Sequence, residues 1–225
     1  MHPFIEHNIK NYILIGESGS GKTENALNFA CFLAQERFSV SLFDMDQTKP
    51  LFRARNFKQE LAASGVNCID SYSFLDSPIV PPGVSSALLD SKQYCVLDVG
   101  GNIIGARMLG QFGDYLNDSN TRILYVINSY RSFSDTIERI SNLMNNILSV
   151  ALLDTIKTQI VSNPYIGEET SAEDIRNGHA KVRAFSKHSG IPIAALTVKI
   201  ELFNAEMEQF AEVPVFPLKK YISYS

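Results

Sequence analysis

The sequence lacks the features that mark several classes of protein. Its three cysteines and four histidines form no C-x-x-C pair and no metal-ligand spacing, so we expect free thiols in a reducing cytoplasm. No run of about 18 apolar residues is present that could span a bilayer, and the first eleven residues contain no signal-like apolar core. Internal repeats and low-complexity segments are also absent. These absences predict a cytoplasmic globular protein.

A surplus of basic charge is missing as well. Lysine and arginine total 20 against 24 acidic residues, which gives a formal net charge of −4 and a pI of about 5.6. This balance provides no evidence for a nucleic-acid partner. Residues 214–225 contain Pro214 and Pro217, which disfavour the C-terminal amphipathic helix of a membrane-binding protein.

Short continuous apolar runs alternate with helical patterns along the whole chain. We expect strands at residues 12–16, 40–44, 94–99, 122–128, 158–162, 193–198 and 213–216. Helices are expected at 22–37, 50–64, 103–116, 133–150, 172–189 and 202–211, with Ser171 as an N-cap. Residues 70–83, with three prolines, are expected to form a long surface connection. The alternation predicts one α/β domain over residues 1–225, a three-layer α/β/α fold around a mostly parallel sheet.

A phosphate-binding motif directly follows the first predicted strand. The residues are Gly16, Glu17, Ser18, Gly19, Ser20, Gly21, Lys22 and Thr23, followed by Glu24. They fit G-x-x-x-x-G-K-[ST], and both the preceding strand and the following helix are where this motif requires them. The glycines let backbone N–H groups approach phosphates at a helix N-terminus. Lys22 is expected to reach the β- and γ-phosphates, and Thr23 to offer its hydroxyl to Mg²⁺.

Carboxylates that could complete a magnesium site end two of the other predicted strands. Asp98 closes an apolar strand and is followed by Val99 and two glycines, of which Gly100 could bring a backbone N–H to the γ-phosphate. Asp44 and Asp46 close the strand after the first helix. Two residues so placed point to opposite sides of an extended chain. One could therefore approach the metal while the other orients the attacking water.

These three motifs together resemble the MinD/ParA-type ATPases. That group also includes nitrogenase iron protein, arsenite-pump ATPases and CooC-type nickel-insertion ATPases. The resemblance implies a parallel sheet covered by helices, ATP with Mg²⁺, and a homodimer that forms face to face across the phosphate loops when nucleotide binds. It implies phosphate binding by Lys22, metal contacts from Thr23, Asp44 and Asp98, and water positioning by Asp46.

The sequence departs from this family at position 17. The family's loop usually carries a lysine there that reaches into the partner's active site, whereas this chain has Glu17, whose charge would repel a nearby phosphate. Either Lys49, Arg53 or Arg55 supplies the positive charge, or hydrolysis is slow, or the dimer differs.

The identity of the base can be tested against the end of a later strand. The phosphate loop alone also resembles metallochaperone GTPases and the molybdenum-cofactor protein MobB. GTPases of that group carry Asn-Lys-x-Asp, but this chain has Asn163-Pro164-Tyr165-Ile166, with no Asp. Because an asparagine amide can both donate to and accept from an adenine edge, Asn163 favours ATP.

Three functions stay open from the sequence. The first is an ATP phosphohydrolase that switches the binding of an unidentified protein partner in assembly or maturation. The second is a small-molecule kinase or ligase of the dethiobiotin-synthetase type, although no motif for a second substrate is visible. The third is a nucleotide-binding module that hardly hydrolyses, which Glu17 makes credible.

Overall fold

An eight-stranded parallel sheet forms the centre of the computed structural model, which describes residues 5–6, 8–46, 54–70 and 80–221. The strand order is β3-β2-β4-β1-β5-β6-β7-β8, and every pairing is parallel. The strands are β1 Asn11–Gly16, β2 Val40–Met45, β3 Val66–Asp70, β4 Tyr94–Val99, β5 Thr121–Ile127, β6 Thr158–Ser162, β7 Ile193–Lys199 and β8 Val215–Leu218. The predicted α/β fold with a parallel sheet is therefore confirmed.

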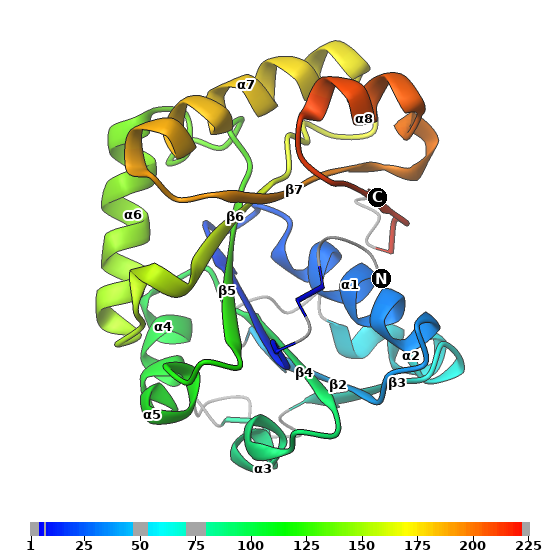
Figure 1. Cartoon of the computed structure of the whole chain (residues 1–225), viewed down its shortest axis with the longest axis vertical. Helices are drawn as coiled ribbons and strands as arrows, with labels where there is room; N and C mark the ends of the chain where they lie inside the picture. Colours follow the sequence, from blue (N-terminus) through cyan, green and yellow to red (C-terminus); the bar gives the residue numbers. More distant parts are fainter. Residues whose placement is uncertain (1–4, 7, 47–53, 71–79, 222–225) are drawn as a thin grey trace.

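Helices cover both faces of the sheet (Figure 1). Helix α1 (Lys22–Gln35) and α2 (Lys58–Ala63) pack on one face, with Leu27 and Leu33 of α1 in an apolar cluster with Leu14 and Leu42 of the strands. The described residues also form the helices α3 Val84–Leu89, α4 Ile103–Gly110, α5 Gly113–Leu116, α6 Ile137–Val150, α7 Ala172–Ser189 and α8 Ala205–Ala211. Short 3-10 turns lie at Ala54–Phe57, Thr155–Lys157 and Ile200–Leu202. No helix among the described residues is both long enough and apolar enough to cross a bilayer.

Several predicted boundaries were wrong because polar side chains and glycines end elements locally. The helix expected over 103–116 is two helices, α4 and α5, with a break beside Gly110 and Gly113. Helix α6 begins at Ile137 rather than 133, since the Thr136 side chain accepts from the backbone of Arg139 as an N-cap. In contrast, Ser171 caps α7 as predicted and forms a reciprocal pair of bonds with Asp174.

Strand β3 was missed, and it changes the interpretation of Asp70. This residue was assigned to a long connection, but it ends β3 and lies opposite Asp44 in the sheet. Its carboxylate is 3.5 Å from the ammonium of Lys58. Residues 71–79 of the expected connection lie outside the described residues. The helix expected at 50–64 is observed only as the turn at Ala54–Phe57 and α2, because its start also lies outside them.

A buried histidine makes the fold sensitive to acid. His179 of α7 is fully buried, with Nδ1 2.9 Å from Ser162 Oγ and Nε2 3.2 Å from the Ala211 carbonyl. Since the carbonyl can only accept, Nε2 carries the proton and Nδ1 accepts from the Ser162 hydroxyl. Burial is the largest cause of the lowered pKa of His179.

We predict that protonating His179 destabilises the protein. The unfolded chain binds this proton more tightly than the folded one, so the His179 contribution to stability is present above the ordinary pKa of 6.5 and is lost as the pH falls below it. Urea unfolding of wild type and His179→Gln at pH 5 and pH 7.5 should show that the variant lacks this acid-dependent loss, so that its stability at pH 5 relative to pH 7.5 is higher than that of wild type. The exposed His188→Gln variant is the control. An unchanged pH dependence in His179→Gln would contradict the assignment.

Candidate functional site

The phosphate loop connects β1 to α1 at the carboxyl edge of the central strands. Three of its glycines adopt positive φ angles: Gly16 at 144°, Gly19 at 78° and Gly21 at 95°. Gly21 is also the N-cap of α1. Only glycine adopts such angles without strain. They turn the chain sharply enough that the loop wraps the N-terminus of α1, where backbone N–H groups favour an anion.

Lys22 and Thr23 occupy the first turn of α1 and are both buried. Lys22 is only 2% exposed, and its ammonium donates to the carbonyl of Glu17 at 2.8 Å. The lysine therefore arches over its own loop. That position places its charge beside the loop amides, where a bound phosphate would meet both.

The predicted aspartates gather beside Thr23. Asp44 and Asp98 are direct neighbours in the β2–β4 ladder, so their side chains lie on the same face of the sheet. The backbone N–H of Asp46 donates to Asp44 at 3.2 Å, and all three carboxylates are buried. Burial, followed by the Asp44 charge, raises the pKa of Asp98 to about 7, although Thr23 and Lys22 oppose this.

These residues fit a magnesium ion. In the described part of the chain the carboxylate oxygens of Asp98 accept no hydrogen bond of ordinary geometry and have the Thr23 side chain beside them, although the residue is only 1% exposed. A buried carboxylate stays ionised at neutral pH only beside a compensating cation, and otherwise binds a proton. Among the residues described, no group of three or more His, Cys, Asp or Glu side chains could hold a metal by itself. Mg²⁺ matches this arrangement, because it typically takes one or two protein oxygens together with phosphate and water.

The loop after β4 rests directly on the phosphate loop. A Cβ atom built on Gly101 would lie 2.6 Å from the Ser18 backbone nitrogen and 2.7 Å from Lys22 Nζ. One on Gly100 would lie 3.1 Å from Asp46 Oδ1. Gly101 thus allows a contact that a side chain would prevent, and a side chain at Gly100 would crowd the Asp46 carboxylate. Gly101 covers the two donors that are expected to bind phosphate, and Gly100 sits against the carboxylate expected to orient water.

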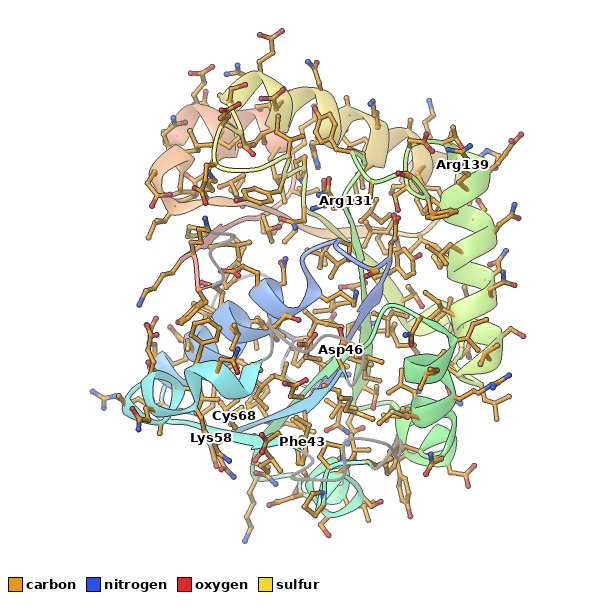
Figure 2. All side chains as sticks on the ribbon, turned by 180° about the vertical axis from the view of Figure 1, so that it is seen from behind. Phe43, Asp46, Lys58, Cys68, Arg131 and Arg139 are labelled. Atoms are coloured by element: carbon orange, nitrogen blue, oxygen red, sulfur yellow. The ribbon has the colours of Figure 1, made fainter. Side chains whose placement is uncertain are left out.

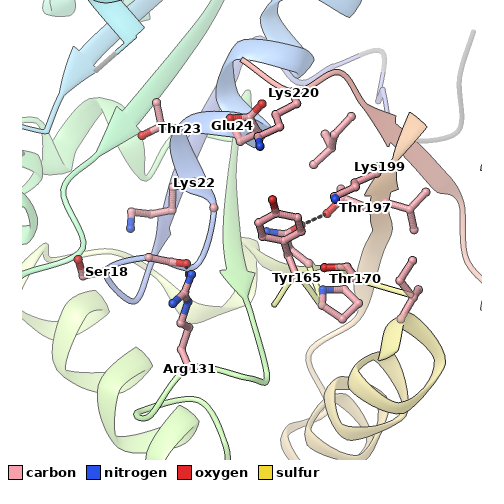
Figure 3. A pocket seen from close by; sticks show the side chains of 17 residues that line it. Ser18, Lys22, Thr23, Glu24, Arg131, Tyr165, Thr170, Thr197, Lys199 and Lys220 are labelled. Atoms are coloured by element: carbon pink, nitrogen blue, oxygen red, sulfur yellow. Dashed lines mark hydrogen bonds between the residues drawn. The ribbon is translucent and has the colours of Figure 1, made fainter. Parts of the chain in front are cut away.

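A cavity of about 370 Å³ extends from the phosphate loop toward the edge formed by β7 and β8 (Figure 3). Its size suits a small-molecule ligand. It is lined by Ser18, Gly19, Gly21, Lys22, Thr23, Glu24, Arg131, Asn163, Pro164, Tyr165, Thr170, Ile175, Thr197, Val198, Lys199, Leu218 and Lys220. Six of the predicted nucleotide-binding positions, Ser18, Gly19, Gly21, Lys22, Thr23 and Glu24, therefore share this cavity with Asn163.

Glu17 does not face this cavity. Its side chain is 8% exposed and accepts hydrogen bonds from Ser134 Oγ at 2.7 Å and from the Phe133 backbone at 3.2 Å. The carboxylate is thus anchored to the segment after β5. The Glu17 carboxylate is therefore directed to these partners rather than into the cavity that the phosphate loop lines.

Asn163, predicted to contact the base, lies beside the phosphate loop, and protein groups bond its amide. The nitrogen donates to the Ser20 carbonyl at 2.7 Å, and the oxygen accepts from Thr197 Oγ1 at 3.0 Å. It therefore braces the phosphate loop against β7. One N–H and one lone pair of the amide lie beyond these two bonds, so base recognition by Asn163 stays a prediction.

Sequence reasoning missed the residues that line the cavity from outside the motifs. Arg131 follows β5, Tyr165 follows β6, and Lys199 and Lys220 come from the β7–β8 edge. The signal available for them was their position just after predicted strands, where side chains meet at one edge of a parallel sheet. Lys49 and Arg53, proposed as cations, lie outside the described residues, as does the side chain of Arg55.

Comparison with family models identifies the class of protein that this fold and loop define. Residues 12–173, most of the chain, match the CobQ/CobB/MinD/ParA nucleotide binding domain. The chain belongs to this family of nucleotide-binding P-loop proteins. The matched range contains the phosphate loop, the aspartates and Asn163. No curated protein matches the sequence.

Solved structures share the fold at low sequence identity. FtsY from Thermotoga maritima superposes with a TM-score of 0.56 and 21% identity, over 91% of this chain and 67% of that one. The signal recognition particle 54 kDa protein from Aeropyrum pernix, in complex with GDP, gives 0.57 and 15% over 87% and 43%. Chloroplast FtsY from Physcomitrella patens gives 0.59 and 14% over 93% and 66%. The chain thus spans about two thirds or less of these proteins, and they support its fold.

Proposed function

We propose that this protein is a Mg²⁺-dependent ATPase that switches the binding of a protein partner. The segment from Asp98 to Gly101 carries the proposal. At one end it offers the buried Asp98 carboxylate beside Thr23, and at the other it lies on the Ser18 amide and Lys22. A change at the phosphates therefore displaces a loop that continues into α4 at Ile103.

The chemistry would transfer the γ-phosphoryl group to water, giving ADP and inorganic phosphate. Lys22 and the loop amides bind the phosphate oxygens. Mg²⁺, held by Thr23 and Asp98 with Asp44 beside them, would neutralise charge on the transferring group. Asp46 orients the water, a role that fits its place against Gly100. These assignments follow the family resemblance, and the positions of the side chains described above support them.

The choice of ATP rests on the end of β6. The residues after Ser162 provide Asn163 but no aspartate that could accept from guanine N–H groups. The structural relative solved with GDP makes GTP the necessary comparison.

We further propose, following the family resemblance, that the protein forms a nucleotide-dependent homodimer in the cytoplasm. Ile103 and Ile104 of α4 are exposed near the loop after β4.

The proposal predicts Mg²⁺-dependent release of phosphate from ATP without any added acceptor. We would measure ATP and GTP turnover with Mg²⁺ or EDTA, alongside the mass in solution with each nucleotide. Lys22→Ala should lose turnover by at least about a hundredfold, while Lys92→Ala, on the exposed turn before β4, should keep it. Release that requires a small-molecule acceptor would instead indicate a kinase or ligase. Faster turnover of GTP would contradict the assignment of ATP.

A further inference from the structure

Arg131 is a cation of the cavity that none of the motifs includes. It follows β5, and its Nε donates to the carbonyl of Gly19 at 2.9 Å. Nε and Cζ lie 3.3 and 3.4 Å from where a Cβ on Gly19 would stand, so the guanidinium packs against this glycine. Figure 3 shows the side chain reaching up to the phosphate loop on the side of Ser18 and Lys22.

The segment that carries Arg131 is held on the phosphate loop by Glu17. The Glu17 carboxylate accepts from Ser134 and from the Phe133 backbone. Ser134 in turn donates its backbone N–H to the Arg131 carbonyl at 2.9 Å, which closes a tight turn. Two contacts of opposite direction therefore join the loops: the Arg131 side chain bonds the phosphate loop, and the phosphate loop's Glu17 bonds the Arg131 turn.

The basic residues that line the cavity divide into two pairs. Lys199 and Lys220 lie at the β7–β8 end, where both contact Glu168. Lys22 and Arg131 lie at the phosphate-loop end (Figure 3). In the described residues Arg131 forms the bond to Gly19 and no ion pair. A guanidinium has five N–H donors in a fork that matches phosphate, and the Gly19 bond uses one of them.

We propose that Arg131 binds the terminal phosphates of the nucleotide from within the same chain, and that Glu17 is the positioning residue that holds Arg131 in place. This inference rests on the proposed nucleotide site. The terminal phosphates are indicated by the position of Gly19, whose carbonyl accepts the Arg131 bond. Gly19 adjoins Ser18, and Gly101 of the loop after β4 lies against the Ser18 amide. Arg131, which β5 places beside the phosphate loop, thus supplies the positive charge that Glu17 does not.

The first test compares the affinities of ATP, ADP, GTP and GDP for Arg131→Gln and wild type, by calorimetry with Mg²⁺. We expect Arg131→Gln to weaken the preferred triphosphate at least about tenfold and its diphosphate less. Arg139→Gln is the matched control (Figure 2). Arg139 pairs with Asp135 and donates to the Ser132 carbonyl of the same segment, but does not line the cavity. The Arg139→Gln variant should bind nucleotide as wild type does.

The outcomes separate this inference from the proposed function. Wild type that binds no nucleotide overturns both. Wild type that binds, with unchanged affinities in Arg131→Gln, overturns the role of Arg131 alone. Equal losses for triphosphate and diphosphate overturn the contact with the terminal phosphates.

A second test addresses Glu17. Glu17→Ala should reproduce the selective loss of triphosphate affinity, and the double variant Glu17→Ala/Arg131→Gln should lose little more than either single variant. Glu17→Gln should recover most of the affinity, because its amide oxygen can still accept from Ser134. Additive losses in the double variant would overturn the positioning role. Urea unfolding of each variant identifies a loss caused by misfolding.

Discussion

Replacing Asp98 by asparagine is expected to abolish Mg²⁺-dependent turnover while making the metal-free protein more stable. Turnover should fall by at least about a hundredfold, because the variant loses the charge that would hold the metal. Stability should rise, because the burial of Asp98 makes its ionised carboxylate costly in the folded protein. Activity and stability thus change in opposite directions at one residue.

The pH dependence of this effect follows from the pKa of Asp98. Burial and Asp44 raise it from the ordinary 3.8 to about 7. Between these values the folded protein binds the Asp98 proton more tightly than the unfolded chain, so the contribution of Asp98 to the stability of the metal-free protein is lost as the pH rises from about 4 to about 7. At pH 8 Asp98→Asn should therefore be more stable by several kcal/mol, as the difference between pKa values of 3.8 and about 7 implies.

Urea unfolding in EDTA at pH 5 and pH 8, together with phosphate release in Mg²⁺, measures both effects. Asp114→Asn, at an exposed position in the first turn of α5, is the control for removing one negative charge. It should change neither quantity. Full turnover in Asp98→Asn would show that this carboxylate does not hold the metal. A loss of stability at pH 8 would contradict the electrostatic argument.

Replacing Gly101 by alanine is expected to lower turnover by about a hundredfold, because displacing reacting groups by about 1 Å has effects of this size. The added Cβ would lie 2.6 Å from the Ser18 backbone nitrogen and 2.7 Å from Lys22 Nζ. The lysine end can move, but the backbone nitrogen belongs to the phosphate loop. The β4 loop must therefore shift away from the groups expected to bind the γ-phosphate.

Gly113→Ala provides the matched control, since a Cβ there meets Leu152 at an ordinary 3.8 Å. Turnover and nucleotide affinity should be measured for both variants, with urea unfolding to compare their stabilities. We expect Gly113→Ala to resemble wild type. Wild-type turnover in Gly101→Ala would show that the β4 loop does not act on the phosphate loop, and would contradict the proposed switch.

The parts of the site that the sequence predicted are those formed by consecutive residues. Gly16 to Thr23 lie between a buried strand and a helix, and local backbone preferences alone bring their amides to the helix N-terminus. Asp98 was predicted for a related reason. A residue that ends a buried parallel strand meets the ends of the neighbouring strands at one edge of the sheet.

The directions of side chains were not predictable in this way. The sequence placed Glu17 in a phosphate loop, where its charge would be unfavourable, but the structure turns it to Ser134, 117 positions away. Arg131 carries no motif and reaches Gly19 across 112 positions. Asn163 was predicted to contact a base, and its amide is braced between Ser20 and Thr197. Each of these contacts depends on which strands are neighbours.

The sequence by itself determined the class of fold, the phosphate loop and the carboxylates at the strand ends, because hydrophobic periodicity and glycine spacing act through residues close together in the chain. Only the tertiary structure decided which charges share the site. The strand order places β5 and β4 on either side of β1, and so brings Arg131 and Gly101 onto the same loop. Such pairings bring together residues far apart in the chain, and no local pattern encodes them.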